Sequence, residues 1–351
     1  MGQSNYREVN AWRRRWTWIV ELAKRGFDPR YLWYRTKFTW FARLDVVGRF
    51  PPHLDIELSD ACNLRCVMCI QGIEDGVKGA GSMDTTLAKR LIDQGAGQGL
   101  RSIKLNWRGE PALHRDLVEI IRHAKARGIL DVQMNTNGIP FTEERIREVI
   151  LAGLDRAIIS MDGATKETYE RIRVRASFEK LHENVLAFRR IRDELGRTRP
   201  FIRIQMVRMK DNAHEVQRFL EMWTPIVDDV RISDVSNRGQ GDVSVGDQVA
   251  VARARCPQPW QRMIVSRDGR VLPCCSDWHL EWVIGDATQE SLADIWRGER
   301  MTRLRQLLRE RRLDEFAPCA QCFVKESYAW EPVTPSTLLQ IKTGERKVYQ
   351  Y

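Results

Sequence analysis

The 351-residue chain contains no long hydrophobic run. None of its apolar stretches approaches the roughly 18 residues that a membrane-spanning helix needs. The opening residues, MGQSNYREVNAWRRRW, also lack the apolar core followed by small residues that marks a secretory signal. We therefore expect the chain to reside in the reducing cytoplasm, either free or peripheral to the inner face of the membrane.

Cysteine is scarce and unevenly placed. None occurs in the 186 residues between Cys69 and Cys256. In a cytoplasmic chain, clustered thiols at short fixed spacings are more often metal ligands than disulfides. The eight thiols form two groups, which are Cys62, Cys66 and Cys69, and then Cys256, Cys274, Cys275, Cys319 and Cys322.

Positive charge is concentrated at the start of the chain. The formal net charge is +10, and residues 1–50 hold eleven Lys or Arg against four Asp or Glu, a net of +7. The same segment holds five of the twelve tryptophans, and Trp12, Trp16 and Val20 repeat at helical spacing. Such a helix either packs on the protein or contacts an anionic membrane through residues 1–45. We expect a phosphorylated or lipid-linked small molecule as partner, and no nucleic acid.

Short β-rich runs alternate with helical patterns between residues 54 and 234. Alternation of this kind predicts parallel strands joined by right-handed crossovers, here an open (β/α)6 barrel. Glycines at 128 and 153 occupy helix-ending positions. The predicted strands are 54–58, 101–106, 131–135, 156–161, 201–207 and 229–233, and the predicted helices are 84–96, 113–127, 143–152, 165–172, 178–195 and 213–222.

The pattern changes after residue 240. The run RMIVSRDGRVLPCC predicts a hairpin with a two-residue turn at Asp268 and Gly269, where both positions can take positive φ. A helix over 291–310 follows, and SNRGQGDVSVGD at 236–247 is the best candidate for a linker. We expect four segments, which are an extension at 1–50, the alternating core at 51–240, a second unit at 241–330 and a tail at 331–351.

The first cysteine group, in SDACNLRCVMCIQG, follows the first predicted strand. Chemistry in such barrels lies at the carboxyl ends of the strands, so the group lies at that rim. Three thiolates can hold three irons of a [4Fe-4S] cube and leave the fourth iron open. The alternative is a zinc site, which needs a fourth ligand. His53 is the nearest candidate in sequence, but it precedes the strand and so belongs to the opposite end.

The C-x3-C-x2-C spacing after the first strand of a six-fold βα pattern resembles the radical S-adenosylmethionine (SAM) superfamily. The resemblance implies that SAM binds the open iron, and that an electron supplied by flavodoxin or ferredoxin cleaves it to a 5′-deoxyadenosyl radical. It covers residues 53–325. In WRGEP, Gly109 and Glu110 match the Gly-Gly-Glu-Pro-like turn that holds the SAM amino group, with Arg108 in place of the first glycine. The motifs NTNG and SMDG end the third and fourth predicted strands, and the resemblance makes Asn135, Asn137 and Ser160 candidates to bind the ribose and carboxylate of SAM. In the following motif, YERIRV, Arg173 is a candidate partner for the carboxylate.

The second cysteine group has four well-spaced thiols. Cys256, Cys274, Cys319 and Cys322 are separated by 17, 44 and 2 residues, and four thiolates close a metal site completely. Zinc remains an alternative. The context resembles the auxiliary iron-sulfur domains called SPASM or, in the shorter form, twitch, which implies a second [4Fe-4S] cluster. Cys275 is left over, either as a buried thiol or alternative ligand, or as a hydrogen-atom donor to a substrate radical.

Together these resemblances imply a radical SAM oxidoreductase or isomerase with two [4Fe-4S] clusters. The cysteine spacing is similar to that of the twitch-type dehydrogenases of aminocyclitol biosynthesis, so a sugar or aminocyclitol is the expected substrate. Two alternatives stay open. One is a maturase that modifies a ribosomally made peptide, and the other is a non-catalytic zinc or iron-sulfur scaffold. No residue of the barrel loops is identified as the group that exchanges a proton or hydrogen with the substrate.

Overall fold

The computed structural model describes residues 22–23, 27–74, 79–234 and 256–320. Within these ranges nine strands form one curved sheet in the order β11-β10-β9-β1-β3-β4-β5-β7-β8. From β1 to β8 all neighbours are parallel, as predicted for an open (β/α)6 barrel. The six predicted strands are β1 (His53–Ile56), β3 (Ser102–Lys104), β4 (Asp131–Thr136), β5 (Arg156–Ser160), β7 (Phe201–Arg208) and β8 (Asp229–Asp234).

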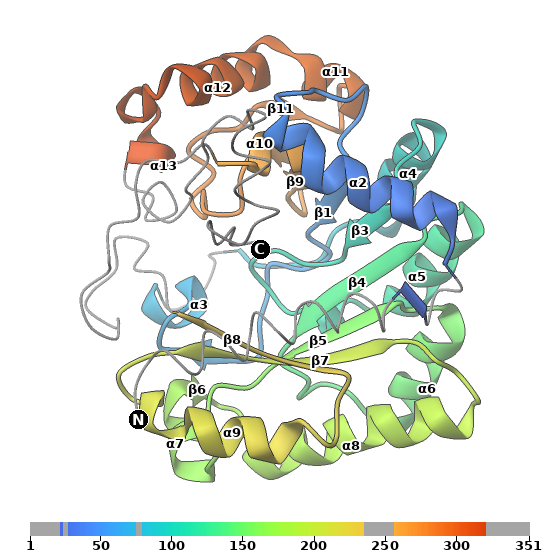
Figure 1. The fold of residues 1–351 in the computed structure, drawn as a ribbon, viewed down its shortest axis with the longest axis vertical. Coiled ribbons are helices and arrows are strands. Elements are labelled where there is room, and N and C mark those ends of the chain that lie inside the picture. Colours follow the sequence, from blue (N-terminus) through green and yellow to red (C-terminus); the bar gives the residue numbers. More distant parts are fainter. Residues whose placement is uncertain (1–21, 24–26, 75–78, 235–255, 321–351) are drawn as a thin grey trace, which may run out of the picture.

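The crossover helices cover the outer face of this sheet (Figure 1). Alternate strand residues such as Leu54, Ile103 and Ile204 are fully buried against them, which is the period-two pattern of a strand with one apolar face. Gly128 and Gly153 have positive φ after helices, as predicted. The helices are α4 (Thr85–Gly97), α5 (Leu117–Ala126), α6 (Glu143–Ala152), α7 (Lys166–Ile172), α8 (Phe178–Glu194) and α9 (Val216–Trp223).

Two of these helices begin later than the sequence pattern predicts. The short 3-10 helix η1 (Pro111–Leu113) precedes α5, and Asp116 occupies the N-cap position of α5. The 3-10 helix η2 (Ala213–Glu215) likewise precedes α9. In both places the apolar periodicity continues through residues whose backbone follows the tighter 3-10 path, so periodicity alone cannot locate the boundary.

The hairpin predicted after residue 240 joins the barrel sheet. Its first strand, β9 (Arg262–Val265), pairs in parallel with β1, and β10 (Arg270–Leu272) and β11 (Gly285–Asp286) extend the sheet from there. The connection is longer than the predicted two-residue turn, and only Gly269 of the Asp268-Gly269 pair has positive φ. The hairpin thus places its turn beside the first strand of the barrel.

The prediction of a single helix over 291–310 was wrong in one respect, because the structure has two helices there. Helix α11 (Leu292–Arg297) ends at Gly298, which has extended backbone, and α12 (Glu299–Glu310) starts directly after it. Trp296, Leu304 and Leu307 are buried as predicted. A glycine at the break removes the side chain that would otherwise favour one continuous helix.

The described part of the N-terminal extension packs on this region. Helix α2 (Pro29–Arg43) lies beside α10 (Gln258–Gln261) in Figure 1, and the Gln261 side-chain amide donates to the Phe38 carbonyl at 2.8 Å. Trp12, Trp16, Val20 and the proposed linker at 236–247 lie outside the described residues. Small elements complete the fold, namely β2 (Arg65–Cys66), α3 (Ile70–Ile73) and β6 (Arg173–Val174) at the barrel rim, and η3 (Leu313–Glu315) and α13 (Ala317–Ala320) after α12. Within the described ranges, no helix is both long and apolar enough to cross a bilayer.

Candidate active site

The three cysteines of the first group lie on the loop that follows β1, at the carboxyl ends of the parallel strands. Cys66 ends the short strand β2, which pairs with β6, and Cys69 is the N-cap residue of α3. The Cys69 amide donates to the Cys66 carbonyl at 3.0 Å, so the two thiols lie on one tight turn. The chain folds this way because the first strand ends at the rim and the loop must return to the next helix.

Nitrogen donors point at two of these sulfurs. The Leu64 amide lies 3.5 Å and the Asn137 side-chain amide 3.8 Å from Cys62 Sγ. Arg173 Nη1 lies 3.7 Å from Cys66 Sγ. Donors of this kind stabilise thiolates, which are the form that binds iron.

Burial opposes ionisation of the same thiols. It raises the pKa of Cys62 to about 12, and the Glu110 carboxylate and the other two thiols of the loop act in the same direction. Burial also raises the pKa of Cys66, although Arg173 opposes it. Cys62 and Cys66 therefore lie in a place where a thiol ionises readily only when a metal takes the charge.

The turn after β3 packs directly on the cysteine loop. A Cβ atom on Gly109 would lie 2.3 Å from the Ser59 carbonyl oxygen and 2.5 Å from that of Ala61, so only glycine fits. The Glu110 amide donates to the Ala61 carbonyl at 2.9 Å. The predicted Gly109-Glu110 turn and the cysteine loop are thus one packed unit.

The Glu110 side chain connects this turn to the end of β4. It accepts hydrogen bonds from the Thr136 hydroxyl at 2.6 Å, the Asn137 amide at 2.7 Å and the Ala112 amide at 3.0 Å. Burial is the largest influence on its pKa, which lies above the ordinary value although each of these donors opposes the rise. Thr136 was not singled out from the sequence, because a threonine inside NTNG has no distinguishing pattern.

The predicted residues at the ends of β4 and β5 lie at the same rim. Asn137 donates to Asn63 Oδ1 at 2.9 Å, which fixes it against the cysteine loop. The buried side-chain oxygen Oδ1 of Asn135 has no hydrogen-bond partner within the described ranges. The backbone N–H of Asn135 donates to Asn106 Oδ1 at 2.8 Å. Ser160 is half-buried at the end of β5. An unsatisfied buried acceptor at this rim fits a ligand that carries a hydroxyl or amino donor.

Arg173 lies against the cysteine loop. Its guanidinium binds Asp162 through Nε at 2.8 Å and Nη2 at 2.7 Å, while Nη1 faces Cys66. Although burial opposes its charge, the Asp162 carboxylate and the Cys66 sulfur raise the pKa of Arg173, so it stays charged. Asp162, the acidic residue of SMDG, also accepts from the Val207 amide at 2.7 Å and was not among the predicted site residues. Its contribution is to orient Arg173.

Two of the four predicted auxiliary cysteines pack on a second apolar cluster, and a third, Cys274, lies near Cys256. Cys256 and Cys319 are half-buried against residues that include Trp260 and Phe316. The pKa of Cys274 is raised by the hydrogen bond with Cys275, by burial and by the nearby Cys256. Cys322 lies outside the described residues.

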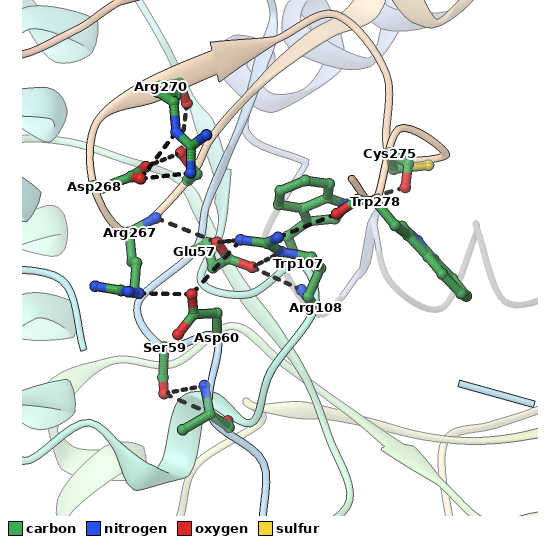
Figure 2. Close-up of polar contacts among 12 residues, drawn as sticks. Glu57, Ser59, Asp60, Trp107, Arg108, Arg267, Asp268, Arg270, Cys275 and Trp278 are labelled. Atoms are coloured by element: carbon green, nitrogen blue, oxygen red, sulfur yellow. Dashed lines mark hydrogen bonds and ion pairs between the residues drawn. The ribbon is translucent and has the colours of Figure 1, made fainter. Parts of the chain in front are cut away.

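The turn after β3 and the auxiliary cysteine loop are in direct contact, which the sequence did not predict. Figure 2 shows Arg108 between Glu57, the residue directly after β1, and the loop that follows Cys274. Arg108 binds Glu57 with two bonds of 2.9 Å and donates to the Trp278 carbonyl at 3.1 Å. The Trp107 indole donates to the Cys275 carbonyl at 3.0 Å. Arg108 had appeared only as a departure from the glycine of the family turn.

The thiol groups fit iron-sulfur clusters. Thiolate is the ligand of such clusters, and the first loop offers three thiols, of which Cys62 and Cys66 have nitrogen donors at their sulfurs. In the described part of the chain, no three His, Cys, Asp or Glu side chains converge on one point that would hold a single metal ion. His53, the alternative zinc ligand, is at the amino end of β1, where Asp55 and Ser102 bind its two nitrogens at 2.8 Å.

Family models match most of the described chain. Residues 56–219 match the model of the radical SAM superfamily, and residues 256–323 match SPASM, an iron-sulfur cluster-binding domain. The chain therefore belongs to the radical SAM superfamily and carries a C-terminal SPASM domain. Its cofactors are SAM and two [4Fe-4S] clusters.

Curated relatives match over part of the chain. A probable GTP 3′,8-cyclase of Saccharolobus islandicus (strain M.14.25 / Kamchatka #1) is 29% identical over 202 residues, which are 57% of this chain and 62% of that protein. The GTP 3′,8-cyclase of Chlorobaculum tepidum is 35% identical over 138 residues, 39% of this chain and 41% of that protein. The chain thus spans less than two thirds of the length of these relatives.

Solved structures share the fold at low identity. BtrN in complex with AdoMet and 2-DOIA is 20% identical, with a TM-score of 0.55 over 82% of this chain and 99% of that chain. Streptococcus suis SuiB bound to the precursor peptide SuiA is 13% identical, with a TM-score of 0.63 over 77% of this chain and 70% of that chain. At these identities the likeness shows the fold alone.

Proposed function

We propose that this radical SAM enzyme abstracts hydrogen from a C–H bond of a sugar or aminocyclitol, which it dehydrogenates or isomerises. When bound, the reduced cluster and SAM supply a 5′-deoxyadenosyl radical. The observation that carries the proposal is the packed unit of three thiols and the Gly109-Glu110 turn at the strand ends. We propose Cys62, Cys66 and Cys69 as the ligands of the first cluster.

The surrounding side chains have separate tasks in this proposal. Asn137 and Arg173 donate toward the sulfurs of Cys62 and Cys66 and hold negative charge on them. Glu110 keeps the turn against the end of β4, where Gly109 and Glu110 present oxygen acceptors to an amino group. The open acceptor of Asn135 suits a ribose hydroxyl, and Ser160 lies at the same rim.

The auxiliary domain supports dehydrogenation over other outcomes. Oxidation of an alcohol carbon to a ketone removes one hydrogen atom, one proton and one electron, and the electron needs an acceptor. A cluster held by Cys256, Cys274, Cys319 and Cys322 provides one, while flavodoxin or ferredoxin reduces the first cluster. The fold likeness to BtrN, whose structure holds AdoMet and 2-DOIA, extends over 99% of that chain and favours this substrate class.

A peptide maturase is the second candidate. It is favoured by the likeness to SuiB bound to its precursor peptide, which has a TM-score of 0.63. An extended peptide and a compact polyol place different demands on the site. Incubation of the reconstituted protein with SAM, dithionite and a deuterated form of each candidate substrate separates them. Only the substrate that is turned over transfers deuterium from one of its C–D positions to 5′-deoxyadenosine.

Anaerobic reconstitution tests the proposal as a whole. About eight irons per chain and the release of 5′-deoxyadenosine from SAM and dithionite are the expected results. One zinc per chain with no cleavage of SAM would instead support a non-catalytic scaffold and overturn the proposal.

Membrane contact through residues 1–45 is part of the same proposal. In the described part of this segment, Trp33 on α2 is 58% exposed and Phe27, just before α2, is 60% exposed, and the last turn of α2 carries Arg43. Aromatic and basic residues together favour an anionic surface. Flotation with anionic liposomes is expected, and a Phe27→Ala/Trp33→Ala variant should float less. Equal flotation of both proteins would exclude docking through these two side chains.

A further inference from the structure

The contact between the SAM-binding turn and the auxiliary loop suggests communication between the two halves of the site. This inference rests on the proposed function, since it takes Gly109 and Glu110 as SAM contacts and Cys274 as a cluster ligand. Arg108 immediately precedes Gly109, and its amide donates to Glu57 Oε1 at 3.1 Å. Any displacement of the turn is therefore a displacement of Arg108.

The Arg108 side chain is held firmly between buried carboxylates. Glu57 is fully buried and binds both ends of the guanidinium, and Asp60 lies 3.7 Å from Arg108 Nη2. Arg267, from the β9–β10 turn, binds Asp60 at 2.6 Å and donates its amide to Glu57 at 3.2 Å (Figure 2). Two carboxylates and two guanidiniums thus form one compact network between the barrel and the auxiliary hairpin.

From this network two hydrogen bonds reach the loop after Cys274. Arg108 donates to the Trp278 carbonyl, and Trp107, whose ring lies 4.3 Å from the guanidinium carbon, donates to the Cys275 carbonyl. The same loop is tied to the auxiliary side by Asp277, which accepts from the Trp282 amide at 2.8 Å. Trp282 in turn packs on Phe316 and on the apolar cluster that holds two of the auxiliary cysteines.

We propose that Arg108 is a positioning residue that couples SAM binding at the Gly109-Glu110 turn to the auxiliary cluster through the loop after Cys274. Hydrogen bonds and backbone dipoles around a cluster tune its reduction potential. If SAM binding displaces the turn, the Trp107 and Arg108 donors to the Cys275 and Trp278 carbonyls move with it. The reduction potential of the auxiliary cluster then changes. Because coupling is reciprocal, the redox state of the auxiliary cluster changes the affinity for SAM by the same factor.

An EPR-monitored redox titration with and without SAM tests this coupling in the holoenzyme. In the wild type, SAM is expected to shift the midpoint potential of the auxiliary cluster. Arg108→Lys keeps the charge but loses the two-bonded contact to Glu57 and is expected to lose the shift. Trp107→Phe removes one N–H donor while keeping a ring, and is expected to reduce the shift.

A matched control separates coupling from stability. Arg156 is also buried and binds Asp131 with two bonds, but at the amino end of the strands. Arg156→Lys should lower stability and leave the SAM-dependent shift intact. The KM for SAM in 5′-deoxyadenosine formation should stay within about fivefold of the wild-type value in both lysine variants. A change of about fivefold in affinity is the size of a weak allosteric coupling.

The possible failures are distinguishable. A full SAM-dependent shift in Arg108→Lys, or no shift in a wild type that cleaves SAM, would overturn the coupling and leave the proposed function standing. A wild type without iron-sulfur clusters or SAM cleavage would overturn the proposed function itself.

Discussion

The two cysteine regions of this protein are built differently. The first lies on a loop among polar groups, where Asn137 and Arg173 point at sulfurs and Glu110 ties the adjacent turn in place. The second lies at the edge of an apolar cluster around Trp260 and Phe316. A polar setting suits a cluster that must bind a charged ligand, while an apolar setting suits one that only exchanges electrons.

Removal of a ligand from the first region should have the largest effect. Cys66→Ala leaves two thiols on the loop, so we expect the loss of about four of the eight irons and the loss of SAM cleavage. Iron and sulfide analysis and chromatography of 5′-deoxyadenosine measure both quantities. Cleavage at the wild-type rate would show that Cys66 is not a ligand of the SAM cluster.

The corresponding change in the second region should have a different outcome. Cys274→Ala is expected to lose about four irons as well, but to retain formation of 5′-deoxyadenosine, because the first loop is intact. The same two assays compare this variant with Cys66→Ala. If both variants abolish cleavage equally, the division between the two regions is wrong.

The close packing of the turn on the cysteine loop predicts a smaller effect. Gly109→Ala places a Cβ atom 2.3 Å from a backbone oxygen and should cost about 1–3 kcal/mol in free energy of unfolding and weaken cluster binding. Gly97→Ala is the control, since no atom lies within 4 Å of its Cβ position at the end of α4. That control should be neutral or slightly stabilising in thermal denaturation. Equal stability of the two variants would contradict the close packing.

The smallest effect is expected away from both regions. The Asp84 side chain caps α4 by accepting from the Thr86 and Leu87 amides at 2.8 and 3.0 Å. Asp84→Ala should cost about 1 kcal/mol in free energy of unfolding and leave iron content unchanged. Loss of iron in this variant would mean that α4 helps to hold the cysteine loop.

Much of the fold was predictable because it depends on local periodicity. The six barrel strands and their parallel order follow from alternating runs such as 131–135 and 201–207, and the six crossover helices were located to within a few residues. The errors were local as well. Gly298 splits one predicted helix, and 3-10 turns shorten two others. The prediction missed these features because the backbone geometry at such points does not change the pattern of apolar residues.

The contacts of the candidate site were less predictable. Cys62, Cys66 and Cys69 follow from spacing, and Glu110 from a short motif. Asp162 and Thr136 were missed, since an acid or a threonine in a turn carries no signal of its own. Arg173 was predicted as a partner for the SAM carboxylate, and the structure shows that it contacts Asp162 and the sulfur of Cys66.

The sequence by itself determined the class of chemistry, because thiol spacing after a strand and the order of strand-end motifs are local properties of the chain. Only the tertiary structure decided how the turn after β3 and the loop after Cys274 meet. The parallel pairing of β9 with β1 brings residues about 210 positions apart to one place, such as Glu57 and Arg267. Pairing between distant segments depends on packing of the whole sheet, and no short stretch of sequence records it.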